Sequence, residues 1–143
     1  MYLSIEDLKK GMRSEVLNVV ARSDENIEQA IIDAMAEVES YLSARYNIAL
    51  EFQKEPNDTT RVPMVVKVVR DIAIYNAYSI SAPINMPEAK VKTYDDTIRF
   101  LRDVQAEKAN IIGLKRNNVK EDGTADSNYI SFSSASPKRT HHY

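Results

Sequence analysis

The stretch from Val62 to Ile80 constrains the fold most, because its apolar residues fall on nearly every side of a helical wheel. A helix of this kind either spans a membrane or forms the centre of a small bundle. Its length alone would permit a span, since about 20 apolar residues cross a bilayer. Ionised groups are costly in lipid, however, and Lys67, Arg70 and Asp71 lie at its middle. We therefore expect a buried central helix against which the other helices pack.

The composition favours one helical domain with a substantial core. The chain has 143 residues, 43% of them hydrophobic and 28% charged, as is usual for soluble globular proteins. Three glycines and five prolines are few, which favours long helices over a many-turned β fold. The amino-terminal sequence MYLSIEDLKK lacks the apolar run of a signal peptide. We therefore expect synthesis in the cytoplasm.

Helical spacing of apolar residues recurs on both sides of the central stretch. Residues Asp24–Tyr46 form one long amphipathic pattern, and a second two-faced pattern runs from Val91 to Val104. Near the amino terminus, Ser4 is expected to cap a short helix that ends at Gly11. The predicted fold class is all-α: a small helical bundle of four to five helices around a central apolar helix.

The connections carry the residues expected of helix ends. A second short apolar segment covers residues 16–20, and Ser23 is expected to cap the helix that follows. A loop is predicted over residues 47–60, with Thr59 or Thr60 capping the central helix. We expect Leu50 and Phe52 in this loop to fold back onto the core. Asn85 to Glu88 is interpreted as a variant capping box for the last helix.

After Lys108 the helical periodicity is lost, which suggests two parts: a helical bundle domain over residues 1–108 and a C-terminal arm over residues 109–143 that is extended, β-like or disordered. Two pieces of the arm, Ile111–Lys115 and Tyr129–Ser133, have strand character. Residues 1–108 contain 14 basic and 18 acidic residues, net −4, whereas residues 109–143 contain 5 basic and 3 acidic, net +2. An acidic body argues against nucleic-acid binding by the bundle.

The sequence offers little for catalysis, so we predict that the protein is not an enzyme and has no cofactor and no metal. Without cysteine, thiol chemistry is excluded. The two histidines, His141 and His142, lie together near the end of the sequence, where a third metal ligand is lacking. Isolated glycines exclude a phosphate-binding loop. We therefore predict no catalytic residues.

Two charged residues stand out within the helical patterns. Arg45 ends the stripe of the long helix, and Asp71 lies inside the most apolar one. One interpretation is that both reach solvent. The other is a structural ion pair between Arg45 and Asp71 that fixes the register of the two helices. Five tyrosines have helical spacing that favours packing over a base-stacking platform, namely Tyr41, Tyr46, Tyr75, Tyr78 and Tyr94.

Four segments, in order and with similar spacing over residues 1–110, resemble a Mu-type family of phage and prophage virion proteins. They are MYLSIEDLKKGMRSEVLN, VESYLSARY, VVRDIAIYNAYS and KVKTYDDTIRFLRDV. A glycine is expected soon after the last helix, but this chain has Lys108-Ala109-Asn110 there and reaches Gly113 only later.

The family is often classified as a domain of unknown function. The resemblance implies a head-completion or head–tail connector protein. It would form a ring homo-oligomer in the virion neck, after assembly in the bacterial cytoplasm, with portal and tail or neck proteins as partners. No membrane and no specific nucleic-acid binding are expected. In this picture the arm would bind a partner through Tyr129, Ile130, Phe132, Lys138 and Arg139. The alternative is a nucleic-acid-binding or regulatory module of a mobile element.

Overall fold

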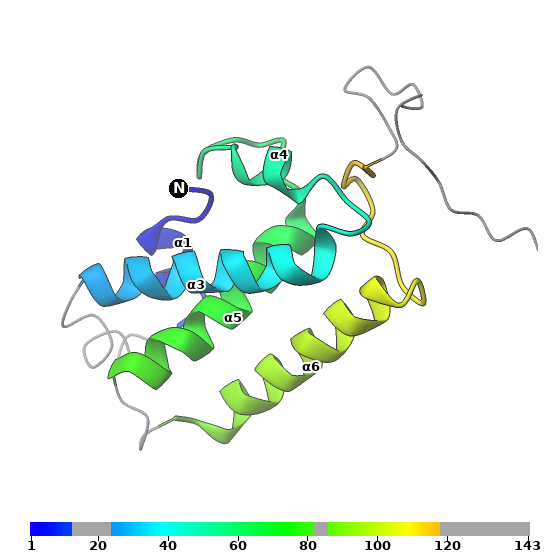
Figure 1. Cartoon of the computed structure of the whole chain (residues 1–143). Coiled ribbons are helices and arrows are strands. Elements are labelled where there is room, and N and C mark those ends of the chain that lie inside the picture. The colour runs from blue at the N-terminus through cyan, green and yellow to red at the C-terminus, as the bar shows by residue number, and fades with distance from the viewer. Residues whose placement is uncertain (13–23, 82–85, 118–143) are drawn as a thin grey trace, which may run out of the picture.

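The computed structural model describes residues 1–12, 24–81 and 86–117, and these contain five helices (Figure 1). In chain order they are α1 (Ile5–Lys10), α3 (Asp24–Leu42), α4 (Ile48–Phe52), α5 (Pro63–Ser81) and α6 (Glu88–Gln105). The described residues form no strand, and Tyr46 and Arg116 make an isolated antiparallel bridge. The all-α prediction is thus confirmed. The apolar segment at 16–20 and the cap at Ser23 lie outside the described residues.

Helix α5 is the central helix that the sequence predicts. Helices α1, α3 and α6 all pack against it, most extensively α3, whereas α4 packs mainly against α3 (Figure 1). Burying a Val or Ile side chain contributes roughly 1.5–3 kcal/mol. No helix in the described part of the chain is long and apolar enough to cross a membrane. The buried side chains of α5 are Val65, Val68, Val69, Ile72, Ala73, Ile74, Ala77 and Tyr78.

Helix α1 begins and ends as its sequence predicts. The Ser4 hydroxyl accepts a hydrogen bond from the backbone N–H of Asp7, and the Asp7 carboxylate accepts one from the Ser4 N–H, which makes a capping box. The helix ends at Gly11. A Cβ atom there would lie 2.9 Å from Cδ1 of Ile74, so the glycine allows α1 to approach α5 closely.

The segment between α3 and α5 differs from the prediction. Helix α3 ends at Leu42 rather than Tyr46, and the expected loop contains α4, which the side chain of Asn47 caps by accepting from the Leu50 N–H. Phe52 packs against Tyr2, with ring centroids 5.2 Å apart, while Leu50 is half-buried. Neither Thr59 nor Thr60 caps α5, because that helix begins only at Pro63.

Helix α6 ends in a Schellman motif without glycine. The N–H of Glu107 donates to Val104 O at 3.1 Å, and the N–H of Lys108 donates to Asp103 O at 2.8 Å. Glu107 has φ 64°, so it occupies the left-handed position where a glycine is usual. At the other end Pro87 is the N-cap residue and makes no side-chain capping bond. The N-cap residue is thus Pro87 and not the predicted Asn85, which lies outside the described residues.

Residues 109–117 lie against the helical body, whereas the sequence predicted that the arm begins at residue 109. Ile111 and Leu114 are buried and belong to the hydrophobic core. The N–H of Ile111 donates to the hydroxyl of buried Tyr46 at 3.1 Å, and the N–H of Asn47 donates to Lys115 O at 2.8 Å. The described body thus continues to Asn117, and residues 111–115 are attached to it without forming a strand.

Candidate functional site

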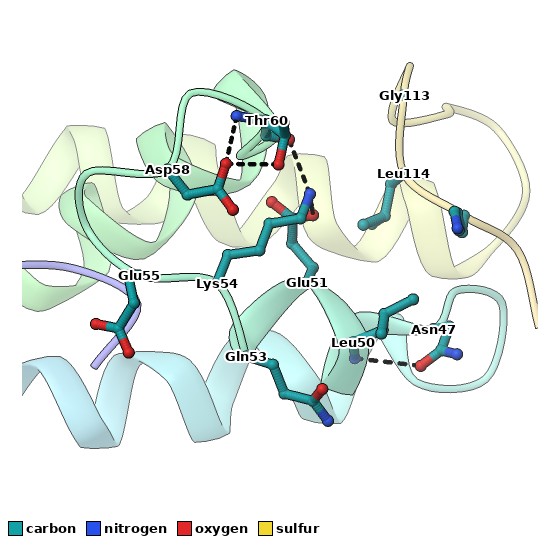
Figure 2. A pocket seen from close by; sticks show the side chains of 11 residues that line it. Asn47, Leu50, Glu51, Gln53, Lys54, Glu55, Asp58, Thr60, Gly113 and Leu114 are labelled. Carbon is teal, nitrogen blue, oxygen red and sulfur yellow. Dashed lines mark hydrogen bonds and ion pairs between the residues drawn. The ribbon is translucent and has the colours of Figure 1, made fainter. Parts of the chain in front are cut away.

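A cavity of about 560 Å³ lies where α4, the loop before α5 and residues 113–115 meet (Figure 2). Its walls come from parts of the chain that are far apart in sequence. The lining residues are Asn47, Leu50, Glu51, Gln53, Lys54, Glu55, Asp58, Thr60, Gly113, Leu114 and Lys115. Most of them are polar, so the cavity is a candidate site for a polar ligand or a peptide segment.

The buried carboxylate of Glu51 organises one wall of this cavity. Its side chain is only 4% exposed, yet both of its oxygens have partners. Oε1 accepts from the Tyr2 hydroxyl at 2.8 Å and from the Val62 N–H at 2.6 Å, and Oε2 accepts from Lys54 Nζ at 2.6 Å. Val62 directly precedes α5, so the carboxylate also lies at the positive end of that helix. A buried charge is tolerated here because it is paired and hydrogen-bonded.

Two titratable groups near Glu51 have shifted pKa values, one raised and one lowered. Burial, together with the hydrogen bond to Glu51, raises the pKa of the Tyr2 hydroxyl far above its usual value. Hydrogen bonds from the hydroxyl and the backbone N–H of Thr60 lower the pKa of Asp58. Arg61 donates to Tyr2 O at 2.9 Å and lies 3.4 Å from Asp7 Oδ2, which ties α1 to the same junction.

This arrangement is built to hold segments together. Within the described residues, no buried side-chain nitrogen or oxygen lacks a hydrogen-bond partner. Glu51 and Lys54 are engaged with each other, and Lys54 also donates to Thr60 O at 2.8 Å. The same residues contain no group of three His, Cys, Asp or Glu side chains placed to hold a metal ion. The junction therefore joins the amino-terminal segment, α4 and the start of α5.

Arg45 and Asp71, the predicted ion pair, have other partners, so this prediction is wrong in the structure. Arg45 lies where α3 and α6 end, and its guanidinium donates to Val104 O, to Ala109 O at 3.0 Å and to Asn110 Oδ1 at 2.8 Å. Asp71 accepts from Lys67 at 2.7 Å, one turn away in α5. Arg45 therefore binds the carboxyl end of α6, where a cation complements the helix dipole.

The tyrosines pack as their spacing predicts. The rings of Tyr75 and Tyr94 stack on each other with centroids 4.0 Å apart, and the Tyr94 hydroxyl donates to Glu37 at 2.8 Å. Tyr46 and Tyr78 are buried. The predicted arm residues Tyr129, Ile130, Phe132, Lys138 and Arg139 lie outside the described residues, as do His141 and His142.

Sequence reasoning missed Glu51, Tyr2 and the attachment of residues 109–117. One local signal was present: Asn47, a good N-cap residue, directly precedes the helix-compatible sequence Ile-Ala-Leu-Glu-Phe. The burial of Glu51 had no such signal, because its partners lie 49 and 11 residues away in the chain.

Comparison with known proteins gives one family. No curated protein and no solved structure matches the chain. The model of the family described as Bacteriophage Mu, Gp36 matches residues 2–129. The match extends beyond the four segments noted in the sequence and covers Tyr129, but not the four later arm residues. Because it spans most of the 143 residues, the chain belongs to this phage protein family.

Proposed function

We propose that this protein is a structural virion adaptor, a head–tail connector or head-completion protein that forms a ring and joins the portal of the head to the tail. The observation that carries the proposal is membership of the Mu-type phage family over residues 2–129.

The proposed partners are portal and tail or neck proteins, and the proposed location is the virion neck. In this proposal the residues after Asn117 contact a neighbouring protein. Tyr129, Ile130 and Phe132 supply apolar contacts, and Lys138 and Arg139 meet an acidic surface.

The test is complementation of a phage or prophage from which the corresponding reading frame has been deleted. The full chain should restore infectious particles, and its absence should leave filled heads and separate tails in electron micrographs. A chain lacking residues 118–143 should fold but fail to join them. Because Ile111 and Leu114 belong to the core, the deletion must start after Asn117.

Two outcomes would contradict the proposal. One is normal joining of heads and tails without this protein. The other is salt-dependent binding of the purified chain to DNA near physiological ionic strength, which would favour the nucleic-acid-binding or regulatory module instead.

A further inference from the structure

An isoleucine projects from an anchored turn near the carboxyl end of the described body. Ile112 is 92% exposed, more than any other large apolar residue among those described. The flanking residues Ile111 and Leu114 are buried, and Gly113 has φ 85°, a conformation that favours glycine. Residues 111–114, here the Ile112 turn, therefore hold an apolar side chain in water in a fixed position.

An apolar groove lies between α3 and α4 and borders the cavity described above at Gln53. Here called the α3–α4 groove, it has a volume of about 440 Å³. Ile32 and Met1 in it are 50% and 48% exposed. No residue of the Ile112 turn lines this groove, and no residue of α3 lines the cavity beside the turn. In this structure the turn therefore leaves the groove of its own subunit unfilled. The lining residues are Met1, Ile32, Met35, Ala36, Glu39, Ala49, Phe52 and Gln53.

The two surfaces carry opposite charge. Helix α3 contains six acidic residues and no basic one, and Glu28 and Glu39 lie on the same stripe of the helix as Ile32. A positive group beside the groove, the amino terminus of Met1, lies 4.0 Å from Glu55. Residues 107–116 contain the acid Glu107 and three exposed bases, net +2, and these bases are Lys108, Lys115 and Arg116.

We propose that the α3–α4 groove binds a second copy of this chain, with the Ile112 turn of one subunit seated between Ile32 and Phe52 of the next. The basic residues beside the turn then face the acidic surface of α3. Because the two contacting surfaces differ, the contact is head-to-tail, and such contacts give rings when the rotation closes. The inference rests on the connector function proposed above and specifies the contact between its subunits.

The chain contains no cysteine, so engineered cysteines report on this contact without background. Full-length Ile32→Cys and Ile112→Cys variants are mixed and oxidised with oxidised glutathione, which forms the disulfide and releases reduced glutathione. The mixture should give a disulfide-linked dimer, and the double variant should give a ladder of higher oligomers on a non-reducing gel. The matched control pairs Ile112→Cys with Val91→Cys, since Val91 is 37% exposed on α6 and lines neither surface.

The contact also predicts which substitutions weaken self-association. Ile112→Ser and Ile32→Ser should each weaken self-association in sedimentation by about tenfold or more, whereas Val91→Ser should leave it unchanged. A mixture of the two defective variants should stop at a heterodimer, because each retains one intact surface. Glu28→Lys combined with Glu39→Lys should also weaken association, and added salt should weaken that of the unaltered chain.

The proposal is overturned if the Ile32–Ile112 pair cross-links no better than the Val91 control, or if Ile112 cross-links chiefly to Ile112. Head–tail joining in the complementation assay is a separate measurement. Joining that fails while the ladder forms contradicts the connector function, and joining that succeeds without the ladder contradicts this contact.

Discussion

At the scale of single residues, Glu51 connects three parts of the chain that are separate in sequence. Its carboxylate binds the Tyr2 hydroxyl, the Val62 N–H and the Lys54 ammonium in a site that is almost closed to water. Removing such a group lowers stability by more than the net contribution of its hydrogen bonds, because buried donors are left without partners.

Replacing Glu51 with Ala should lower the free energy of unfolding by roughly 3 kcal/mol, because the Tyr2 hydroxyl and the Val62 N–H both lose their acceptor. Tyr2→Phe should cost only about 1 kcal/mol, since it removes a single hydrogen bond. Urea denaturation measures both, with the exposed Glu55→Ala as control. Equal stability of Glu51→Ala and the control would contradict this role for the carboxylate.

Glu107 presents the opposite case, a residue whose replacement should help. Because it occupies the left-handed position of the Schellman motif, Glu107→Gly should raise stability by about 1 kcal/mol. Glu107→Ala lacks this relief and serves as the control. Thermal denaturation should show a Tm a few degrees higher for the glycine variant alone.

At the scale of elements, the long helices could be predicted from the sequence, whereas their attachments could not. Apolar periodicity over many turns placed α3 and α5 within a few residues of their observed ends. Helix α4 has five residues, too few turns to show a period. The predicted partner of Arg45 was wrong because helix-wheel reasoning gives a face but not the position along a neighbour's axis. Likewise, the docking of residues 109–117 depends on Tyr46 and Arg45, which belong to a distant segment.

Loss of Arg45 should release the carboxyl end of α6 from the segment that follows it. Arg45→Ala removes bonds to Val104 O, Ala109 O and Asn110 Oδ1, and we expect a loss of about 2 kcal/mol. Hydrogen exchange should accelerate at the amide of Ile111. The control is Arg99→Ala on the exposed face of α6, and unchanged exchange at Ile111 would contradict the assignment.

Helix α1 should give the protein an acid-sensitive contact. Burial alone would raise the pKa of Asp7, but hydrogen bonds from Ser4 and the nearby Arg61 guanidinium outweigh it and hold that pKa below its usual 3.8. A lowered folded-state pKa stabilises the protein above the unfolded-state pKa, and this stabilisation is lost as the pH falls through the folded-state value. Relative to Asp7→Asn, the unaltered chain should be about 1 kcal/mol more stable at pH 7, and this difference should shrink below about pH 4.

At the scale of the whole molecule, the described body extends past Lys108 and includes residues 109–117. Helices α3, α5 and α6 form a body whose core also includes Ile111 and Leu114 (Figure 1). This extension was hidden in the sequence, because two apolar residues around an exposed Ile112 show no helical period. The family assignment, in contrast, was accessible from ordered segments of sequence.

Two truncations test whether residues 109–117 belong to the folded body. A chain that stops after Asn117 keeps the buried residues Ile111 and Leu114, so its Tm is the reference for the shorter chain. For a chain that stops after Lys108, the free energy of unfolding should be roughly 3–5 kcal/mol lower, because the buried side chains of Ile111 and Leu114 are missing. Equal stability of the two truncated chains would instead place the end of the folded domain at Lys108.

The enclosure of α5 has a consequence for how such proteins diversify. Its exposed residues are few, namely Pro63, Lys67, Ser79 and Ile80. Changes in this helix therefore alter stability more than they alter the outer surface. Under the connector function and subunit contact proposed above, relatives from different phages should differ mainly on the outer surfaces of α3, α4 and the Ile112 turn. Exchanging those surfaces between relatives should then transfer the choice of subunit partner while the interior stays the same.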